Sequence, residues 1–589
     1  MSFWMGSTRV HGNDWNGFRM TSDSKVSSAA FDSGVESRWL LTPARAAGIV
    51  IAFAVLAVSW HVDGVHLRSA LHSGSVHALL ALLRGLFPPD FSRDFLRVVF
   101  RALVSTLTTA IAGTALSLVV AIPLGMLATP ILWRRGILSA ANERNSVAVL
   151  QSAASQAVFA LLGLLRAVPD LAWGLLFVTA VGLGSLAGVL ALAVAYAGVL
   201  GRVYADVFAN VDTQPLEALQ ATGASRLQIF LRGVWPQAFP NVVAYTLYSL
   251  ECCIRAASVL GFVGAGGIGY EVGLSMRLFE YRQVMTLILA FVLLLALTDA
   301  MSKWLRSRLR FKGASARGGT GHYVRYGVVA VAVIASFYLS GFTPEHFREA
   351  DLFTNVLRFC RGLWPPDFAK EFVLSISPLL MQTLAISVLG TFMGVSIGGI
   401  LAIPATSTFV FAHPDEPGAW SLPRHGLRWI VFLTARLLLN VLRSIPDLVW
   451  VLVCILLVGV GPFAGTLAIG LHTAGVLGKL YAETMEEAPM APIEGLRSLG
   501  AGRVQLLAWA LWPQAKRMLG SYTVLRWETN LRVSAILGLV GGGGLGQAIY
   551  NNAQLGFYPR LATLLLLVYL LVVVSDRIGE FVVHERQEI

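Results

Sequence analysis

Eight charged residues in or beside the long apolar stretches of this chain form four pairs at a spacing of four residues. The pairs are Arg166 with Asp170, Glu251 with Arg255, Arg443 with Asp447, and Glu528 with Arg532. Within a bilayer each such charge costs roughly 2.5–3.5 kcal/mol or more unless it is paired or faces water. These residues are therefore the first candidates for a functional role.

Two interpretations of the pairs remain open. Residues four apart are neighbours on a helix, so each arginine can pair with the acid of its own helix and lock a bundle together. Alternatively, the arginines line a translocation path and compensate an anionic solute, because guanidinium groups bind oxyanions in a bidentate manner. The second interpretation makes four arginines the path residues: Arg166, Arg255, Arg443 and Arg532.

A short polar stretch that occurs twice between apolar segments predicts a helix-turn-helix in each copy. The copies span residues 215–223 and 492–500, and Trp-Pro-Gln follows each one. A proline suits the start of a helix because it needs no N–H partner there, and Glu217 or Glu494 then meets the positive end of the helix dipole. A glycine ends each copy and allows a turn, after which a second helical run is expected to end near the Trp-Pro pair.

One constant offset relates the two halves of the chain. Arg84-Gly-Leu-Phe-Pro-Pro-Asp-Phe91 returns as Arg361-Gly-Leu-Trp-Pro-Pro-Asp-Phe368, an offset of 277 residues. The same offset takes Glu217 to Glu494 and the glycine-rich segment 259–269 to 536–546. The offset indicates a tandem duplication. Because it links equivalent loops after an even number of spans, the repeats are expected to be parallel.

The composition is that of a membrane protein. Hydrophobic residues make up 56% of the 589 residues and charged residues 13%, against about 25% charged in soluble domains. Mean hydropathy is +0.68. The net charge of +12 does not indicate nucleic-acid binding, because the basic residues lie mostly between apolar spans, where they set orientation. Membrane lipid is therefore the expected surrounding.

Apolar stretches near the bilayer-crossing length of about 20 residues predict an all-α integral membrane fold with about twelve spans. They lie near 46–62, 100–128, 147–165, 171–200, 237–263, 283–302, 324–341, 377–404, 429–443, 448–477, 515–540 and 560–576. Several are short, so about ten to twelve is the expected range. The expected parts are a disordered cytoplasmic tail (1–38), a first half (39–302), a basic linker (303–323) and a second half (324–589).

The basic linker predicts the orientation, since loops rich in lysine and arginine stay in the cytoplasm. Counting spans from it places both termini and both polar loops on the cytoplasmic side. The Pro-Pro-Asp-Phe loops and the glycine-rich segments are then expected to face outward.

The sequence contains no motif for catalysis or for a resident cofactor. Without a G-x-x-x-x-G-K-[ST] loop, this chain cannot itself cradle ATP. Gly264-Ala-Gly-Gly-Ile-Gly269 fits G-x-G-x-x-G but follows an apolar span, so its glycines are instead expected to let a broken segment pack against its twin. The scattered histidines and the absence of H-E-x-x-H favour neither an enzyme nor a metal site.

The polar loops resemble the cytoplasmic Glu-Ala-Ala loop of ABC importer permeases, on which ATPase subunits dock. The matching residues are Glu217, Ala218, Gly223 and Pro236 in the first copy and Glu494, Gly500 and Pro513 in the second. The triplet departs from the family pattern at Leu219, Gly495 and Leu496. Further on, Gly233 and Ala510 replace an isoleucine, and tryptophan stands where leucine is usual.

Longer strings are similar to the permease of phosphonate ABC importers. Arg-x-x-Pro-Asp-Leu and Leu-Gly-x-Val-Gly-x-Gly-Gly-x-Gly occur in both halves, and Glu528-Thr-Asn530-Leu-Arg532 makes the second half the closer match. The resemblance implies a type I importer fold in the bacterial inner membrane, with one chain supplying both halves. It also implies two copies of an ABC ATPase, which would hold ATP and Mg²⁺, and an extracytoplasmic binding protein that delivers an organophosphonate.

Other functions stay open at this point. Phosphite, hypophosphite and phosphate-ester importers share these motifs, so the resemblance leaves the anion undecided. A secondary transporter driven by an ion gradient can also contain parallel repeats, but it would not need the two polar loops.

Overall fold

The computed structural model describes residues 54–62, 84–85, 87–129, 145–310, 321–341, 351–407 and 422–585. The chain divides into two units, Met1–Val55 and Leu56–Ile589, and every helix named below belongs to the second unit. The expected tail at 1–38, residues 46–53 of the expected span at 46–62 and the linker residues 311–320 lie outside the described residues.

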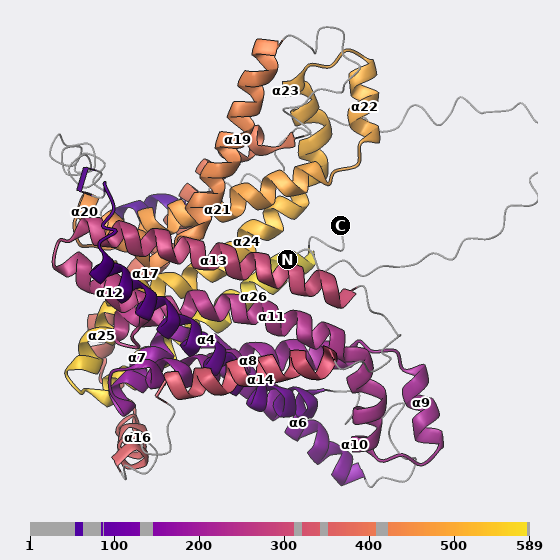
Figure 1. Cartoon of the computed structure of the whole chain (residues 1–589), viewed down its shortest axis with the longest axis vertical. Coiled ribbons are helices and arrows are strands. Elements are labelled where there is room, and N and C mark those ends of the chain that lie inside the picture. Colours follow the sequence, from indigo (N-terminus) through magenta and orange to yellow (C-terminus); the bar gives the residue numbers. More distant parts are fainter. Residues whose placement is uncertain are drawn as a thin grey trace, which may run out of the picture. The chain divides into compact units, whose positions relative to one another are not determined.

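Every regular element of the described residues is a helix (Figure 1). The first repeat contains α4 (Arg93–Ala128), α6 (Asn145–Ala167), α7 (Asp170–Val181), α8 (Ser185–Ala209), α9 (Gln214–Ala221), α10 (Arg226–Ile229), η1 (Phe230–Val234), α11 (Trp235–Leu260), η2 (Gly261–Val263), α12 (Gly267–Arg277) and α13 (Tyr281–Arg310).

The second repeat contains α14 (Gly321–Leu339), α16 (Asp351–Gly362), α17 (Lys370–Ala405), α19 (Leu422–Ser444), α20 (Asp447–Val458), α21 (Pro462–Glu486), α22 (Ala491–Ser498), α23 (Arg503–Leu506), η3 (Leu507–Leu511), α24 (Trp512–Leu537), η4 (Gly538–Val540), α25 (Leu545–Gln554) and α26 (Tyr558–Glu585). From α4 to η2 in the first repeat and from α17 to η4 in the second, both ends of every helix repeat at the 277-residue offset. The tandem duplication predicted from the sequence is therefore confirmed.

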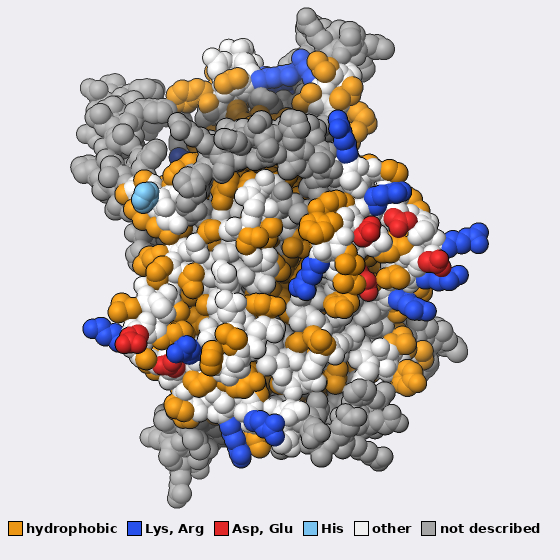
Figure 2. All heavy atoms as spheres, turned by 90° about the vertical axis from the view of Figure 1, so that its left-hand side faces the viewer, with side chains coloured by type: hydrophobic (Ala, Val, Ile, Leu, Met, Phe, Trp, Pro, Cys, Tyr) orange, Lys and Arg blue, Asp and Glu red, His pale blue; other side chains and the backbone are white. Residues whose placement is uncertain are grey.

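Seven described helices are long and apolar enough to cross a membrane, and three bent helix pairs raise the number to ten. This matches the lower end of the expected range. The expected span at 324–341 falls in α14, whose described apolar part, Ala330–Leu339, is shorter than a bilayer crossing. Figure 2 shows hydrophobic side chains spread over one face of the molecule between groups of charged side chains.

The expected single spans at 171–200 and 448–477 are wrong, because each is broken by glycine. Gly182 and Gly184 have φ values of 101° and 141° and separate α7 from α8. Only glycine adopts such angles readily, so no helix continues through them. In turn α6 and α7 meet at 86°, and α19 and α20 at 94°. A proline precedes α7 and α20 in each case, which ends the preceding helix.

Small residues bring α17 and α21 of the second repeat close together. On α17, Gly390, Gly394 and Gly398 recur every fourth residue and face α21. A Cβ on Gly398 would lie 2.8 Å from the Ala474 carbonyl oxygen and 3.0 Å from the Gly478 amide nitrogen. Such stripes drive helix association in lipid, where apolar side chains gain little by leaving the solvent and close backbone packing is needed instead.

Gly398→Ala is therefore expected to destabilise the protein by about 1–3 kcal/mol, the usual loss for overpacking a tight interface. The neighbouring Gly399 is a matched control, since a Cβ there meets no atom within 4 Å in the described structure. Unfolding of the purified protein in mixed micelles measures both variants. An equal loss of stability in the two would contradict the close packing of α17 on α21.

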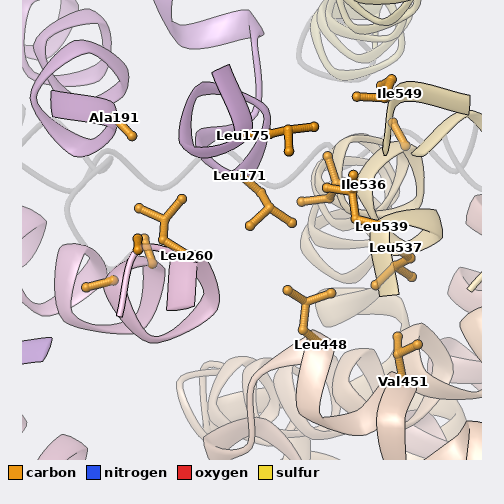
Figure 3. Packing of buried hydrophobic residues seen from close by; sticks show 14 of the residues in the cluster. Leu171, Leu175, Ala191, Leu260, Leu448, Val451, Ile536, Leu537, Leu539 and Ile549 are labelled. Atoms are coloured by element: carbon orange, nitrogen blue, oxygen red, sulfur yellow. The ribbon is translucent and has the colours of Figure 1, made fainter. Parts of the chain in front are cut away.

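One apolar core joins the two repeats. It includes Leu171 and Leu175 of α7, Leu448 of α20 and Ile536 of α24, and Figure 3 shows Leu175 pointing toward Ile536. The second repeat also reaches over the first through α14, which packs on α4, and α16, which packs on α7. The halves thus share one interior in which charged groups from both can meet.

Candidate functional site

Helices α9 and α10 form the first predicted helix-turn-helix, and α22 and α23 form the second (Figure 1). Gly223 and Gly500 make the turns, with φ values of 80° and 81°. The Ala224 amide donates to the Leu219 carbonyl at 3.3 Å, and the Ala501 amide to the Leu496 carbonyl at 3.2 Å. These bonds close the helix ends in the way a glycine C-cap requires. We call the two elements the hairpins.

A buried aliphatic side chain anchors each hairpin to the helix that follows it. Leu216 is fully buried beside Phe208 and Phe230, and a Cβ on Gly233 would lie 2.5 Å from its Cδ2 atom. In the second hairpin Ile493 packs against Ala510. Gly233 and Ala510 are the two residues that replace the family's isoleucine. Their small size leaves room for the anchoring side chain.

The expected end of the second helical run at the Trp-Pro pair is wrong. In both repeats the chain continues through a five-residue π-helix, η1 or η3, directly into α11 or α24. The Trp235 amide donates to the Phe230 carbonyl, five residues back. The wider π turn lets Pro236, which lacks an N–H, enter a continuous helix without breaking it.

The hairpins present an exposed surface of mixed character. Glu217, Ala218 and Pro236 are exposed in the first repeat, as are Glu494 and Pro513 in the second. Large apolar side chains are exposed beside them, including Leu227 at 56% and Val504 at 74%. Exposed apolar side chains around a charged residue are typical of protein interfaces.

Two of the four charge pairs form within their helices. The Arg255 Nη2 atom lies 2.7 Å from the Glu251 Oε1 atom on α11, and Arg532 bonds Glu528 on α24. Arg255 remains 45% exposed, whereas the Arg532 side chain is 24% exposed. The exposed Arg255 guanidinium therefore keeps donors available to a further anion.

The pairing of Arg166 with Asp170 and of Arg443 with Asp447 is wrong. The proline between each pair bends the chain, so the two residues no longer sit on one helix. Asp170 accepts a hydrogen bond from the Leu171 amide at 3.1 Å at the start of α7, where the helix dipole favours a carboxylate. Arg443 donates from Nε to the Asn440 side chain at 3.3 Å.

Arg166 instead pairs across the repeats with an acid that the sequence interpretation missed. Its Nη2 atom lies 3.1 Å from the Asp576 Oδ2 atom of α26, and Asp576 Oδ1 lies 2.9 Å from Arg532 Nη2. One carboxylate thus bridges an arginine from each repeat, and we call this the cross-repeat cluster. The sequence carried a signal for it, because Asp299 precedes Asp576 by the same 277 residues.

The glycine-rich segments pack within their own repeats rather than against each other. The Ile268 amide donates to the Thr106 hydroxyl at 2.8 Å, and the Leu545 amide to the Thr383 hydroxyl at 2.9 Å. A Cβ on Gly267 would lie 2.5 Å from the Thr106 Oγ1 atom. The glycines therefore serve close contact with α4 and α17, the helices that carry these threonines.

The Pro-Pro-Asp-Phe loops are fastened to the last long helix of their repeat. The Arg282 Nε atom donates to the Pro88 carbonyl at 2.8 Å, and the Arg560 Nε atom to Asp367 at 3.1 Å. A hydrogen bond from the Ser92 backbone lowers the pKa of Asp90. The Ala369 backbone and Arg560 likewise lower the pKa of Asp367. Both loops therefore present a carboxylate at neutral pH.

Together these features define a helical membrane protein made of two tandem parallel repeats, each with one exposed hairpin. Among the residues described, no three His, Cys, Asp or Glu side chains are placed to hold a metal ion. Residues 136–311 and 425–586 match the family described as binding-protein-dependent transport system inner membrane component. The chain belongs to this family and is a multi-pass transport permease subunit.

Three relatives extend the comparison. The phosphate-import permease protein PhnE of Mycolicibacterium smegmatis is 30% identical over 540 residues, which cover 90% of this chain and 92% of that one. The phosphite transport system permease protein PtxC of Stutzerimonas stutzeri is 34% identical over 267 residues, 44% of this chain and 88% of that one. The putative cryptic phosphonate transport system permease protein PhnE2 of Escherichia coli is 37% identical over 117 residues, 20% of this chain and 96% of that one.

Proposed function

We propose that this chain forms the whole membrane passage of an ABC importer for small phosphorus-containing anions, with organophosphonates as its main substrates. The observation that carries the proposal is the alignment with a phosphate-import permease over 90% of this chain. Relatives named for phosphite and phosphonate transport support the same class of solute. An extracytoplasmic binding protein delivers the anion, in keeping with the family's description.

In this proposal each hairpin docks one copy of a separate ABC ATPase, which holds ATP and Mg²⁺. The exposure of Glu217 and Glu494, with apolar side chains beside them, supports the docking role. Closure of the ATPase pair pushes on the hairpins, which continue without a break into α11 and α24. The push therefore reaches the helices that carry Arg255 and Arg532. Both hairpins and both chain ends lie in the cytoplasm.

The path arginines compensate the anion as it passes between the repeats. Arg255 and Arg532 occupy equivalent positions on α11 and α24, and each is held by the acid four residues before it. Arg166 adds a third guanidinium through the cross-repeat cluster, and Arg443 is its counterpart in the second repeat. Arginine suits this role because it stays protonated and presents several donors to oxyanions.

Uptake by the complete transporter in proteoliposomes tests the proposal. With ATP inside and the binding protein outside, labelled methylphosphonate is expected to accumulate, and phosphite and phosphate serve as competitors. Arg255→Gln with Arg532→Gln is expected to lower the uptake rate about tenfold or more, since each lost charge-assisted hydrogen bond is worth about 1.5–3 kcal/mol. The yield of assembled complex should fall less than the uptake rate, although Arg532→Gln also removes one arginine of the cross-repeat cluster.

Two outcomes would contradict the proposal. If none of the three anions accumulates while ATP is hydrolysed, the assigned solute class is wrong. If uptake follows an imposed ion gradient without ATP, the chain works as a secondary transporter. An equal loss of uptake and of assembled complex in the arginine variant would instead assign those arginines to the structure of the bundle.

A further inference from the structure

The two repeats differ sharply at one polar cluster, although their helices begin and end at equivalent residues. In the second repeat the cluster consists of Asp447, His472, Thr473, Arg526 and Asn530. The residues 277 positions earlier are Asp170, Ala195, Tyr196, Ser249 and Cys253. Only the aspartate is common to both. The first repeat therefore lacks the cationic side chains that surround this aspartate in the second.

A chain of hydrogen bonds holds one side of the Arg526 guanidinium. Its Nε atom lies 3.4 Å from the Thr473 hydroxyl, which donates to the Asn530 side-chain oxygen at 3.1 Å. The Asn530 amide in turn donates to the Thr391 hydroxyl at 2.9 Å. These bonds tie α24 to α21 and α17 and fix the direction of the guanidinium.

The Nη2 atom on the other side of the guanidinium has no hydrogen-bond partner among the described residues. Arg526 Nη2 and Asp447 Oδ1 are 3.9 Å apart, too far for a hydrogen bond, and both atoms are buried without a hydrogen-bond partner among the described residues. Buried polar atoms normally find partners, so an unpaired donor and an unpaired acceptor 3.9 Å apart mark a place for a polar ligand.

A need to neutralise the Asp447 carboxylate does not explain why an arginine stands at position 526. Its counterpart Asp170 stands at the same helix start with Ser249 in place of the arginine, and a backbone hydrogen bond is its partner there. The aspartate position therefore does not require an arginine. An arginine inside a membrane span is costly and needs a reason of its own.

The cluster lies where the two repeats meet. Ile445 and Pro446, which precede Asp447, line a small cavity together with Ser258 and Ile268 of the first repeat. His472 Nδ1 lies 2.9 Å from the Ile445 carbonyl and 3.7 Å from Asp447 Oδ1. The Arg526 side chain is 14% exposed, although its Nη2 atom is buried.

We propose that Arg526, together with His472, forms a binding site for a phosphorus oxyanion, and that each chain has one such site, in the second repeat only. The guanidinium binds the anionic oxygens, and the Asp447 carboxylate accepts from a hydrogen-bearing group of the ligand, such as P–OH or an ammonium. The inference rests on the proposed function, because that function supplies the class of anion. It predicts one anion site per chain, whereas a duplicated sequence would by itself suggest two.

Equilibrium dialysis of labelled methylphosphonate against the assembled permease–ATPase complex, without binding protein, tests the site. We expect one anion per complex. Arg526→Ser, which installs the first-repeat residue, should weaken binding about tenfold or more, the usual effect of losing a charge-assisted contact. Ser249→Ala in the first repeat is the matched control and should bind as the unmodified complex does. His472→Ala, which also installs the first-repeat residue, should weaken binding less.

The outcomes separate this site from the proposed function. Unchanged binding in Arg526→Ser, two anions per complex, or no binding by a complex that still takes up methylphosphonate would each overturn the site alone. Absence of uptake by the unmodified transporter would overturn the function instead. If Arg526→Ser does not fold, Arg526→Lys keeps the charge but loses the planar donor fork. Weaker binding by a folded Arg526→Lys complex supports the site, and unchanged binding refutes it.

Discussion

Reversing both hairpin acids, with Glu217→Lys and Glu494→Lys in one chain, is expected to abolish ATP-driven uptake while the protein still inserts and folds. Both side chains are exposed, and the buried Leu216 and Ile493 side chains anchor the hairpins. A reversed charge in an interface places like charges together, at a cost of several kcal/mol. A loss of about 3 kcal/mol in docking corresponds to roughly a hundredfold weaker ATPase attachment. Uptake and ATP hydrolysis are measured in the same proteoliposomes.

The repeat itself supplies the control for this experiment. Asp94 and Glu371 are another pair of acids 277 residues apart, and both are exposed in the first turns of α4 and α17. The ion pair of Asp94 with Arg97 is highly exposed and therefore worth little. Asp94→Lys with Glu371→Lys should leave uptake near its normal rate. Undiminished uptake in the hairpin variant would refute the docking role, and the two single variants show whether both hairpins couple equally.

Removing the carboxylate that bridges the repeats, with Asp576→Asn, is expected to destabilise the protein by about 2–4 kcal/mol. Asp576 lies within 3.1 Å of Arg166 and 2.9 Å of Arg532, and the three side chains are 22–34% exposed. Breaking a buried charge pair costs about 3–5 kcal/mol, and the partial exposure here reduces that figure. The variant also leaves two guanidinium groups facing each other. Unfolding in mixed micelles measures the loss.

A double-mutant cycle and a control from the other repeat make this test specific. Arg166→Gln in the Asp576→Asn background should restore part of the stability, because it removes one of the two facing cations. Arg443→Gln, at the position equivalent to Arg166, should change stability by about 1 kcal/mol or less, because the hydrogen bond it loses is to Asn440 of its own helix. Equal effects of Arg166→Gln and Arg443→Gln would show that the cross-repeat cluster contributes nothing to the joining of the repeats.

The hairpins were predictable because their signals are local. The proline at the start, the acid in the first turn and the glycine at the turn lie within nine residues, 215–223, and each acts through its own backbone. The structure places α9 and α22 where this pattern predicts them. The continuation of α10 into α11 was not predictable in the same way. A proline normally ends a helix, and the π turn that accommodates Pro236 has no simple sequence signal.

The charge pairs show the limit of spacing as a guide. A separation of four residues predicts a contact only while both residues share one straight helix. This holds for Glu251 with Arg255 but fails for Arg166 with Asp170, where the helix axes meet at 86°. The bend turns Arg166 toward Asp576, a residue 410 positions away. No local pattern encodes such a contact.

By itself the sequence determined that this is a membrane protein of two parallel repeats with one hairpin each. Composition and the constant offset are found by counting residues, and the turn residues act on their own backbone, so none of these signals depends on the tertiary structure. Tertiary structure alone decided which charges meet: Arg166 with Asp576 across the repeats, and Arg526 beside Asp447 in one repeat only. The reason is physical. The partner of each charged side chain depends on how the bent helices of the two repeats pack. Two segments with the same spacing of charged residues can therefore form different contacts when a few side chains at their interface differ.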